Sequence, residues 1–250
     1  RAGYRLGHGR VIDHMFLDGL EDAYDKGRLM GTFAEDCAQA YQFTRSAQDD
    51  FAIASLTRAQ KAIETGAFAA EVVPVHTNAA KVERIVDRDE QPGKARLEKI
   101  AALKPAFRDN GTVTAANSSS ISDGAAALVL MRRQEAERRG LTPLATIVGH
   151  STHAQAPNLF ATAPIGALGK LCERTGWQLK DVDLFEINEA FAVVTMATMV
   201  DLDLPHDKVN VGARIIVTLL AALQRYDLKR GMATLCIGGG EATAIAIERI

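Results

Sequence analysis

The chain has few cysteines, and their spacing does not fit a structural role. Cys37, Cys172 and Cys236 are the only three among 250 residues. An odd number without CxxC spacing argues against a disulfide framework or a zinc site, and the usage suits a reducing cytoplasm. His150 and His153 lie close together, but no third ligand accompanies them. We therefore expect no metal site and interpret both as surface or loop histidines.

Other absences narrow the possible partners. No apolar run approaches the roughly 20 residues that span a bilayer, and no apolar segment with a small-residue cleavage site marks export. The net charge of −2 gives no electrostatic reason to bind nucleic acid or an anionic membrane. We expect a cytoplasmic globular protein. The chain opens without Met, in polar, loop-like sequence, so we expect it to be the interior of a longer chain.

Helical and strand patterns alternate through the second half of the chain, which predicts a layered α/β fold with a mixed sheet. Ser46 is the expected N-cap of one helix and Gly66 its stop. The predicted helices cover residues 11–20, 34–42, 46–65, 97–103, 132–139, 163–175, 189–200 and 213–226. The predicted strands cover residues 72–75, 125–131, 145–148, 182–187, 208–211 and a closing hairpin, 233–237/242–248.

Two of these segments carry a further expectation. Residues 125–131 form a continuous apolar run, which is typical of a strand buried on both faces. Between the strand 208–211 and the helix 213–226 only Gly212 remains. Connections from strand to helix usually take 2–6 residues, so the short connection indicates that residues are missing there.

Cys236 stands at the expected end of a strand and is followed by Ile237 and the glycine run 238–240. A thiol at that point can move a proton, and amides exposed by glycine can hold a developing oxyanion. The alternative is a buried, inert cysteine beside a hairpin turn. The glycine run is not a phosphate-binding loop, because no Lys-Ser/Thr follows it and it opens a strand rather than a helix.

Asn188 stands where a predicted strand runs into a predicted helix. Asn is a favoured N-cap, so a purely structural role accounts for it. The functional alternative is a side-chain amide at the carboxyl end of a strand, where ligands of α/β sheets collect.

Four segments occur in order and together resemble the thiolases, specifically acetyl-CoA acetyltransferases. They are Gly111-Thr112-Val113-Thr114-Ala115-Ala116-Asn117, Asp123-Gly124-Ala125-Ala126, Asn188-Glu189-Ala190-Phe191 and Cys236-Ile237-Gly238-Gly239-Gly240. Residues 30–36 resemble a further segment of that family. The resemblance implies a thiolase-like layered fold with an α-rich loop domain. It divides the chain into a loop domain over coenzyme A (1–111), the end of the N-terminal core domain (112–139) and the C-terminal core domain (140–250).

The resemblance also implies the chemistry: acyl transfer through a cysteine thioester, with acetyl-CoA or acetoacetyl-CoA as substrate. It implies no cofactor, with coenzyme A as a substrate, and a dimeric or tetrameric homo-oligomer. Cys236 would be the acid and base for the α-proton, Asn188 would hold a water in one oxyanion hole, and the Gly238 amide would serve the other. The residues matched to substrate binding are Ser119, Phe191, Met30, Leu20 and Ala115.

The sequence departs from the family at two catalytic elements. The family's nucleophilic cysteine lies before the point where this sequence begins, and Cys37 and Cys172 are expected to be core residues of helices. The family's Gly-His-Pro loop falls at the join of Val211 and Gly212. We therefore expect an enzyme whose sequence is incomplete here. The alternatives are an inactive, truncated relative that binds coenzyme A or serves assembly, and a β-ketoacyl synthase-like enzyme, which would need histidine near position 236.

Smaller departures concern the substrate. Leu29 and Ser122 stand where the family has histidine and asparagine, and residues 158–164 replace a Met-Gly-containing stretch. Lys94 and Arg96 are candidates for the phosphates of coenzyme A. A solvated charged surface is the favoured interpretation of these two residues.

Overall fold

The computed structural model describes residues 3–4, 6–79 and 82–250. Helices and a hairpin make up the first half: η1 (Phe16–Leu20), α1 (Met30–Ala40), α2 (Arg45–Glu64), β1 (Val75–Ala79), β2 (Val82–Val86), α3 (Gln91–Lys94), η2 (Leu97–Ala102) and α4 (Arg133–Arg138). The second half alternates: β3 (Ala145–Ala154), η3 (Pro157–Thr162), α5 (Ala163–Thr175), η4 (Leu179–Asp181), β4 (Leu184–Ile187), α6 (Ala192–Asp201), β5 (Val209–Asn210), α7 (Ile215–Arg225), β6 (Arg230–Ile237) and β7 (Glu241–Arg249).

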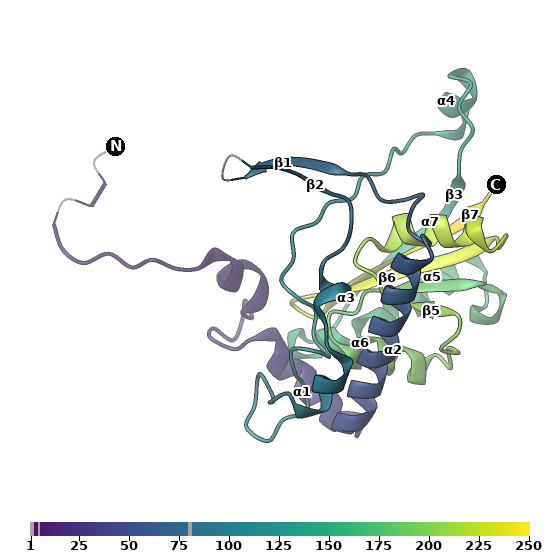
Figure 1. Ribbon diagram of the computed structural model, residues 1–250. Coiled ribbons are helices and arrows are strands. Elements are labelled where there is room, and N and C mark those ends of the chain that lie inside the picture. The colour runs from purple at the N-terminus through teal and green to yellow at the C-terminus, as the bar shows by residue number, and fades with distance from the viewer. Residues whose placement is uncertain (1–2, 5, 80–81) are drawn as a thin grey trace.

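A five-stranded sheet organises the second half, with strand order β3-β7-β6-β4-β5. The strand β4 runs parallel to β5 and β6, whereas β7 pairs antiparallel with β6 and β3. The sheet is therefore mixed, which confirms the predicted fold class. Figure 1 shows the sheet with helices around it, and the closing hairpin β6–β7 in yellow at its centre.

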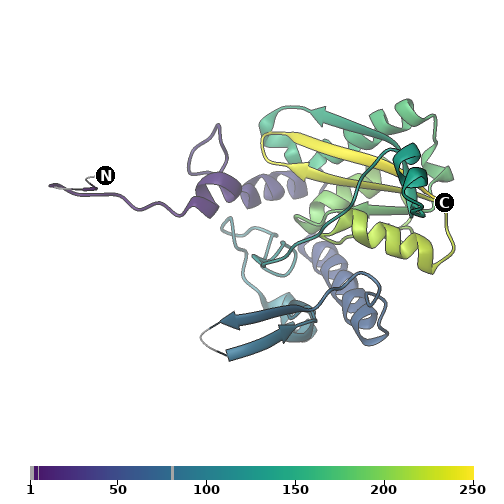
Figure 2. The same ribbon diagram turned by 90° about the horizontal axis from the view of Figure 1, so that it is seen from above.

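Helices cover both faces of this sheet (Figure 2). On one face α5 packs against alanines of β7, namely Ala242, Ala244 and Ala246. Small side chains let the helix approach the sheet closely. On the other face α7 packs Leu219 and Leu223 against Ala233 and Ile247. Side chains along β6 and β7 therefore alternate between the two faces of the sheet. Met232, Thr234 and Cys236 lie on the α5 side, together with their partners on β7.

The first half of the chain packs beside this sheet and also extends away from it. Figure 1 shows the N-terminal arm and the β1–β2 hairpin projecting from the body of the molecule, while α1 and α2 lie against it. The predicted N-cap Ser46 is wrong, because Thr44 caps α2 and its hydroxyl accepts a hydrogen bond from the Ala47 amide at 3.1 Å. Gly66 follows the helix with φ of +66° and is confirmed as its stop.

The predicted buried strand 125–131 is wrong. Residues 119–134 are all exposed, and no strand is formed there. Val129 and Leu130 are 86% and 71% exposed. The segment has the composition of a buried strand, but no neighbouring strand among the described residues pairs with it. Figure 1 shows it running out to α4 and returning to β3.

Local boundaries differ from the predictions in four more places. The helix α1 begins at Met30 rather than residue 34, so the Met30-Gly31-Thr32 segment is helical. The predicted helix 11–20 is reduced to the short η1. The strand β2 lies in a stretch for which no helix or strand was predicted. The strand β3 extends to Ala154 and includes His150 and His153, so neither lies in a loop.

Two connections near the sheet's edge change the interpretation of the site. The helix α6 begins at Ala192, and its N-cap is Phe191. Asn188 is therefore not a cap, and the N-cap interpretation is wrong. The helix α7 begins at Ile215, so four residues rather than one follow β5. That length is ordinary for a connection from strand to helix, and the argument from its shortness is wrong.

Candidate active site

Cys236 lies one residue before the end of β6, and residues 238–240 form the tight turn into β7. Gly239 and Gly240 have φ of +93° and +83°, a region that favours glycine. Gly240 also approaches the main chain closely: a Cβ there would lie 2.5 Å from the Gln155 carbonyl oxygen. The glycines are thus needed to turn the chain immediately after Cys236.

Aromatic and sulfur-containing side chains surround Cys236. The thiol and Met30 pack against a buried cluster that includes Phe33, Phe160 and Phe191. The Met30 sulfur lies 3.5 Å from the position that a Cβ on Gly238 would take. Four residues predicted from the sequence, Cys236, Gly238, Phe191 and Met30, are therefore brought together from separate segments.

Asn188 and Ser119 meet at the turn between β4 and α6. The Asn188 amide donates to the Thr234 carbonyl on β6 at 3.0 Å, and the Ser119 amide donates to the Ala190 carbonyl at 2.9 Å. The Ser119 hydroxyl donates to the Glu189 carbonyl at 2.6 Å. No hydrogen bond within the described residues occupies the Asn188 side-chain amide. That amide is free to bind a water or a substrate oxygen.

Burial raises the pKa of the Cys236 thiol to about 12. Cys236 is therefore protonated at neutral pH, the form that donates a proton. Burial, with a smaller contribution from Asp201, also raises the pKa of Cys37 to about 12. Cys37 lies in α1 and is buried, as predicted, while Cys172 in α5 is partly buried against the core. A reactive thiolate is favoured at neither.

Not every predicted site residue joins this cluster. Leu20 ends η1 and is not part of the apolar cluster around Cys236. Ala115 is exposed beside the buried Thr114. Lys94 pairs with Glu90, one helical turn away, and both side chains are more than 60% exposed, which favours the solvated surface over a phosphate site. His153 packs against Gly166 of α5, and its Nε2 lies 3.2 Å from Gln155 Oε1.

Sequence reasoning missed three residues of the site. Phe107 packs edge-on against Phe191, with ring centroids 6.0 Å apart, and Phe160 lies on another side of that ring at 6.5 Å. Phe107 lies outside the segments singled out from the sequence, and Phe160 lies within residues 158–164, which were noted only as a departure from the family. Glu189 stands beside Asn188 in the Asn-Glu-Ala-Phe segment, which was the available signal, and it is held by Ser55 of α2 at 2.8 Å.

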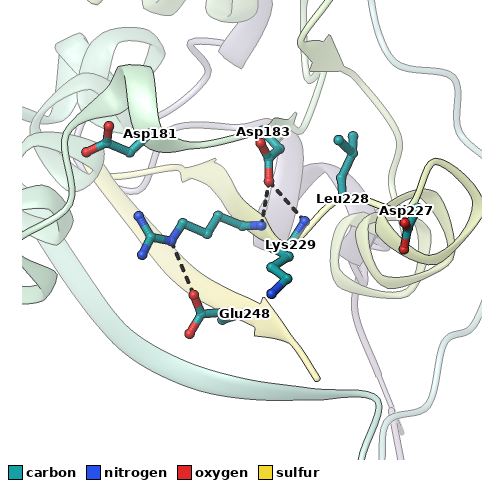
Figure 3. Close-up of a pocket in the computed structure, with 7 residues that line it drawn as sticks. Asp181, Asp183, Asp227, Leu228, Lys229 and Glu248 are labelled. Atoms are coloured by element: carbon teal, nitrogen blue, oxygen red, sulfur yellow. Dashed lines mark hydrogen bonds and ion pairs between the residues drawn. The ribbon is translucent and has the colours of Figure 1, made fainter.

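A surface pocket of about 570 Å³ lies elsewhere. Figure 3 shows Asp183 accepting two main-chain hydrogen bonds and Glu248 pairing with the neighbouring arginine. This pocket is at the Arg230 end of β6, and Cys236 is near the other end. Within the described part of the chain, no three His, Cys, Asp or Glu side chains are arranged to hold a metal ion. The pocket therefore offers no chemistry related to Cys236.

Comparison with known families identifies the chain. The model described as "Thiolase, N-terminal domain" matches residues 1–134, and "Thiolase, C-terminal domain" matches residues 141–249. The chain belongs to the thiolase family. Its whole length resembles the Bacillus anthracis acetyl-CoA acetyltransferase structure at 41% identity with a TM-score of 0.94, covering 67% of that chain.

Curated thiolases give the same result. A probable acetyl-CoA acetyltransferase of Dictyostelium discoideum is 44% identical over all of this chain and 64% of its own length. The acetyl-CoA acetyltransferase of Escherichia coli K12 is 45% identical, and the chain covers 67% of it. The chain thus spans about two thirds of these thiolases. The Dictyostelium alignment extends over 266 residues against the 250 of this chain, so that thiolase has internal residues without a counterpart here.

Proposed function

We propose that the protein carrying this chain is an acetyl-CoA acetyltransferase, which joins two acetyl-CoA molecules or splits acetoacetyl-CoA with coenzyme A. The observation that carries the proposal is the assembly of Cys236, the glycine turn and the Asn188–Ser119 turn beside one apolar cluster. Relatives above 40% identity that are named acetyl-CoA acetyltransferases support it.

Cys236 serves the α-proton in this mechanism. In the splitting direction a thiolate adds to the C3 carbonyl of acetoacetyl-CoA, and the C2–C3 bond breaks, which leaves the acetyl group as a thioester on that sulfur and the electron pair on C2. The Cys236 thiol then gives its proton to C2, which releases acetyl-CoA. In the joining direction the Cys236 thiolate removes that proton from acetyl-CoA. The raised pKa keeps the sulfur protonated and suits the donor role.

Charge develops on the thioester oxygen when the α-carbon carries the electron pair. The free Asn188 side-chain amide supplies one polar contact for it, through a bound water. The Gly238 amide faces the other oxygen, on the acyl group being transferred. Donors fixed in advance by a folded turn lower the barrier because they need no rearrangement during the reaction.

The thiol that carries the acyl group is, we infer, none of the three in this sequence. Cys236 is committed to the proton, and Cys37 is buried in α1 behind the aromatic cluster. Cys172 packs against the core between α5 and the sheet. The connection from β5 to α7 carries no histidine to activate a nucleophile. This chain therefore supplies the α-proton half of the reaction.

We further propose a cytoplasmic homo-oligomer, dimeric or tetrameric, that uses no cofactor other than coenzyme A as substrate. The absence of paired cysteines supports the compartment. No helix of the described residues is long and apolar enough to cross a bilayer. The alternative, a coenzyme A-binding or assembly subunit without chemistry, is not favoured by relatives that are named as enzymes.

The test is exchange of the acetyl-CoA α-protons for deuterium, followed by proton NMR in D₂O. The wild-type protein should exchange them, and Cys236→Ala should lose at least about a hundredfold of the rate. The Cys172→Ala variant is the matched control and should retain full activity. Undiminished exchange by Cys236→Ala would exclude Cys236 as the base. Acetoacetyl-CoA thiolysis, together with the intact mass compared with 26.9 kDa, then shows whether the acyl-carrying thiol is present.

A further inference from the structure

Glu189 is held by two serines that come from distant parts of the chain. The Ser55 hydroxyl of α2 donates to Glu189 Oε2 at 2.8 Å, and the Ser119 hydroxyl donates to the Glu189 main-chain oxygen at 2.6 Å. Glu189 is the next residue after Asn188. Both contacts therefore restrain the chain immediately beside the Asn188 side chain.

Main-chain hydrogen bonds fix the rest of the turn on two of its sides. The Asn188 amide donates to the Thr234 carbonyl of β6, the Ser119 amide donates to the Ala190 carbonyl in the turn, and the Ala192 amide donates to the Asn117 carbonyl. Among the described residues, no main-chain hydrogen bond joins the turn to α2. There the hydrogen bond from the Ser55 hydroxyl to the Glu189 carboxyl attaches the turn to α2.

The environment of Glu189 is unusual for a residue with no more than a structural role. The side chain is partly buried, and no Lys or Arg of the described residues forms an ion pair with it. Burial raises the pKa of its carboxyl to about 7, and the hydrogen bond from Ser55 opposes that rise. A poorly solvated carboxyl with one neutral partner costs folding free energy, so its presence calls for a function at this turn.

We propose that Glu189 is a positioning residue: its carboxyl, held by Ser55, fixes the turn that aims the Asn188 side-chain amide at the water that contacts the substrate oxygen. This inference rests on the proposed function, because it assigns Glu189 a part in the same α-proton step. Glu189 touches neither substrate nor reacting atoms and acts through its neighbour. A displacement of about 1 Å at such a donor is enough to slow a reaction up to a hundredfold.

The experiment measures α-proton exchange of acetyl-CoA as a function of its concentration. Glu189→Ala should lower the maximal rate roughly tenfold to a hundredfold, with KM changed less than about threefold, because the loss concerns the transition state. Glu189→Gln should restore most of the rate, because its amide oxygen still accepts from Ser55. Ser55→Ala should behave like Glu189→Ala, and the double variant should be no slower than either single one.

Glu71→Ala is the matched control. The Glu71 carboxylate accepts from the Thr218 hydroxyl of α7 at 2.7 Å and so attaches the same half of the chain to the sheet domain, away from Asn188. Its exchange rate should stay within about twofold of wild type. The proposal is overturned if Glu189→Ala also stays within twofold, or if Glu71→Ala slows exchange as much as Glu189→Ala does.

A separate measurement distinguishes this inference from the proposed function. Amide hydrogen exchange of the Asn188–Phe191 peptide should be at least about tenfold faster in Glu189→Ala and unchanged in Glu71→Ala. If wild-type protein fails to exchange acetyl-CoA α-protons, the proposed function is wrong. The amide result still decides whether Glu189 fixes the turn, and unaltered protection in Glu189→Ala would refute that.

Discussion

Glu186 should make the stability of the protein fall as pH rises from about 4.5 to about 7. It lies in β4 and is 1% exposed. Asn210 Nδ2 donates to its Oε1 at 2.7 Å, and the Gly212 amide donates to its Oε2 at 3.4 Å. Burial is the largest influence and raises the pKa to about 7 from 4.5, with Glu71 adding to the rise and both hydrogen bonds opposing it.

The sign and size follow from proton linkage. Because the folded pKa is the higher one, the folded state keeps a proton that the unfolded state has lost. The stability contributed by the protonated form is complete below pH 4.5 and is lost progressively up to about pH 7. At about 1.4 kcal/mol for each pH unit, this amounts to about 3 kcal/mol. Glu189, with its pKa also raised to about 7, adds a similar loss in the same window.

The assay is urea unfolding at several pH values between 5 and 8.5. Glu186→Gln cannot ionise and keeps an oxygen that accepts from Asn210, so about half of the pH-dependent loss of unfolding free energy should disappear. Glu241→Gln, at an exposed position on β7, is the control and should keep the wild-type slope. A Glu186→Gln variant whose stability falls with pH as steeply as wild type would refute this reasoning.

Three further outcomes are expected. Burial of the Cys236 thiol, with its pKa of about 12, should slow alkylation by iodoacetamide at pH 8 roughly 40-fold relative to a free cysteine. Peptide mass spectrometry measures the alkylation rate, and the rate of a free cysteine would contradict the prediction. Gly240→Ala should lower the free energy of unfolding, measured by chemical denaturation, by at least about 2 kcal/mol because of its positive φ and close main-chain contact. Gly238→Ala, with one ordinary contact, should lower it by under about 1 kcal/mol. Equal losses would show that the turn does not require glycine at position 240. In calorimetry Gly31→Ala should lower Tm, because its Cβ would lie 2.4 Å from the Phe107 ring. Gly169→Ala, which has open space around its Cβ, should raise Tm slightly. A raised Tm in Gly31→Ala would refute the close packing of Phe107 on Gly31.

Features set by neighbouring residues were predictable. The glycine run gave the turn after Cys236, because only glycine takes its positive φ without strain. Helix α5 was predicted with its observed bounds, Ala163–Thr175, and the structure has a Pro in its first turn and Gly176 at its end, both signals of local sequence. The Asn-Glu-Ala-Phe and Cys-Ile-Gly segments are continuous in sequence, so the resemblance to thiolases could be recognised from them without any coordinates.

Tertiary contacts decided what the pattern left open. The apolar run 125–131 has the composition of a core strand, but burial requires neighbouring strands, and none among the described residues pairs with it. Asn188 became a free amide in a turn because the segment around Ser118 pairs with Phe191 and delays the start of α6. Ser55 and Glu189 are 134 positions apart. Their contact, like the packing of Phe107 and Phe160 on Phe191, depends on the tertiary fold. Local propensity gives no information on contacts between residues so far apart in sequence.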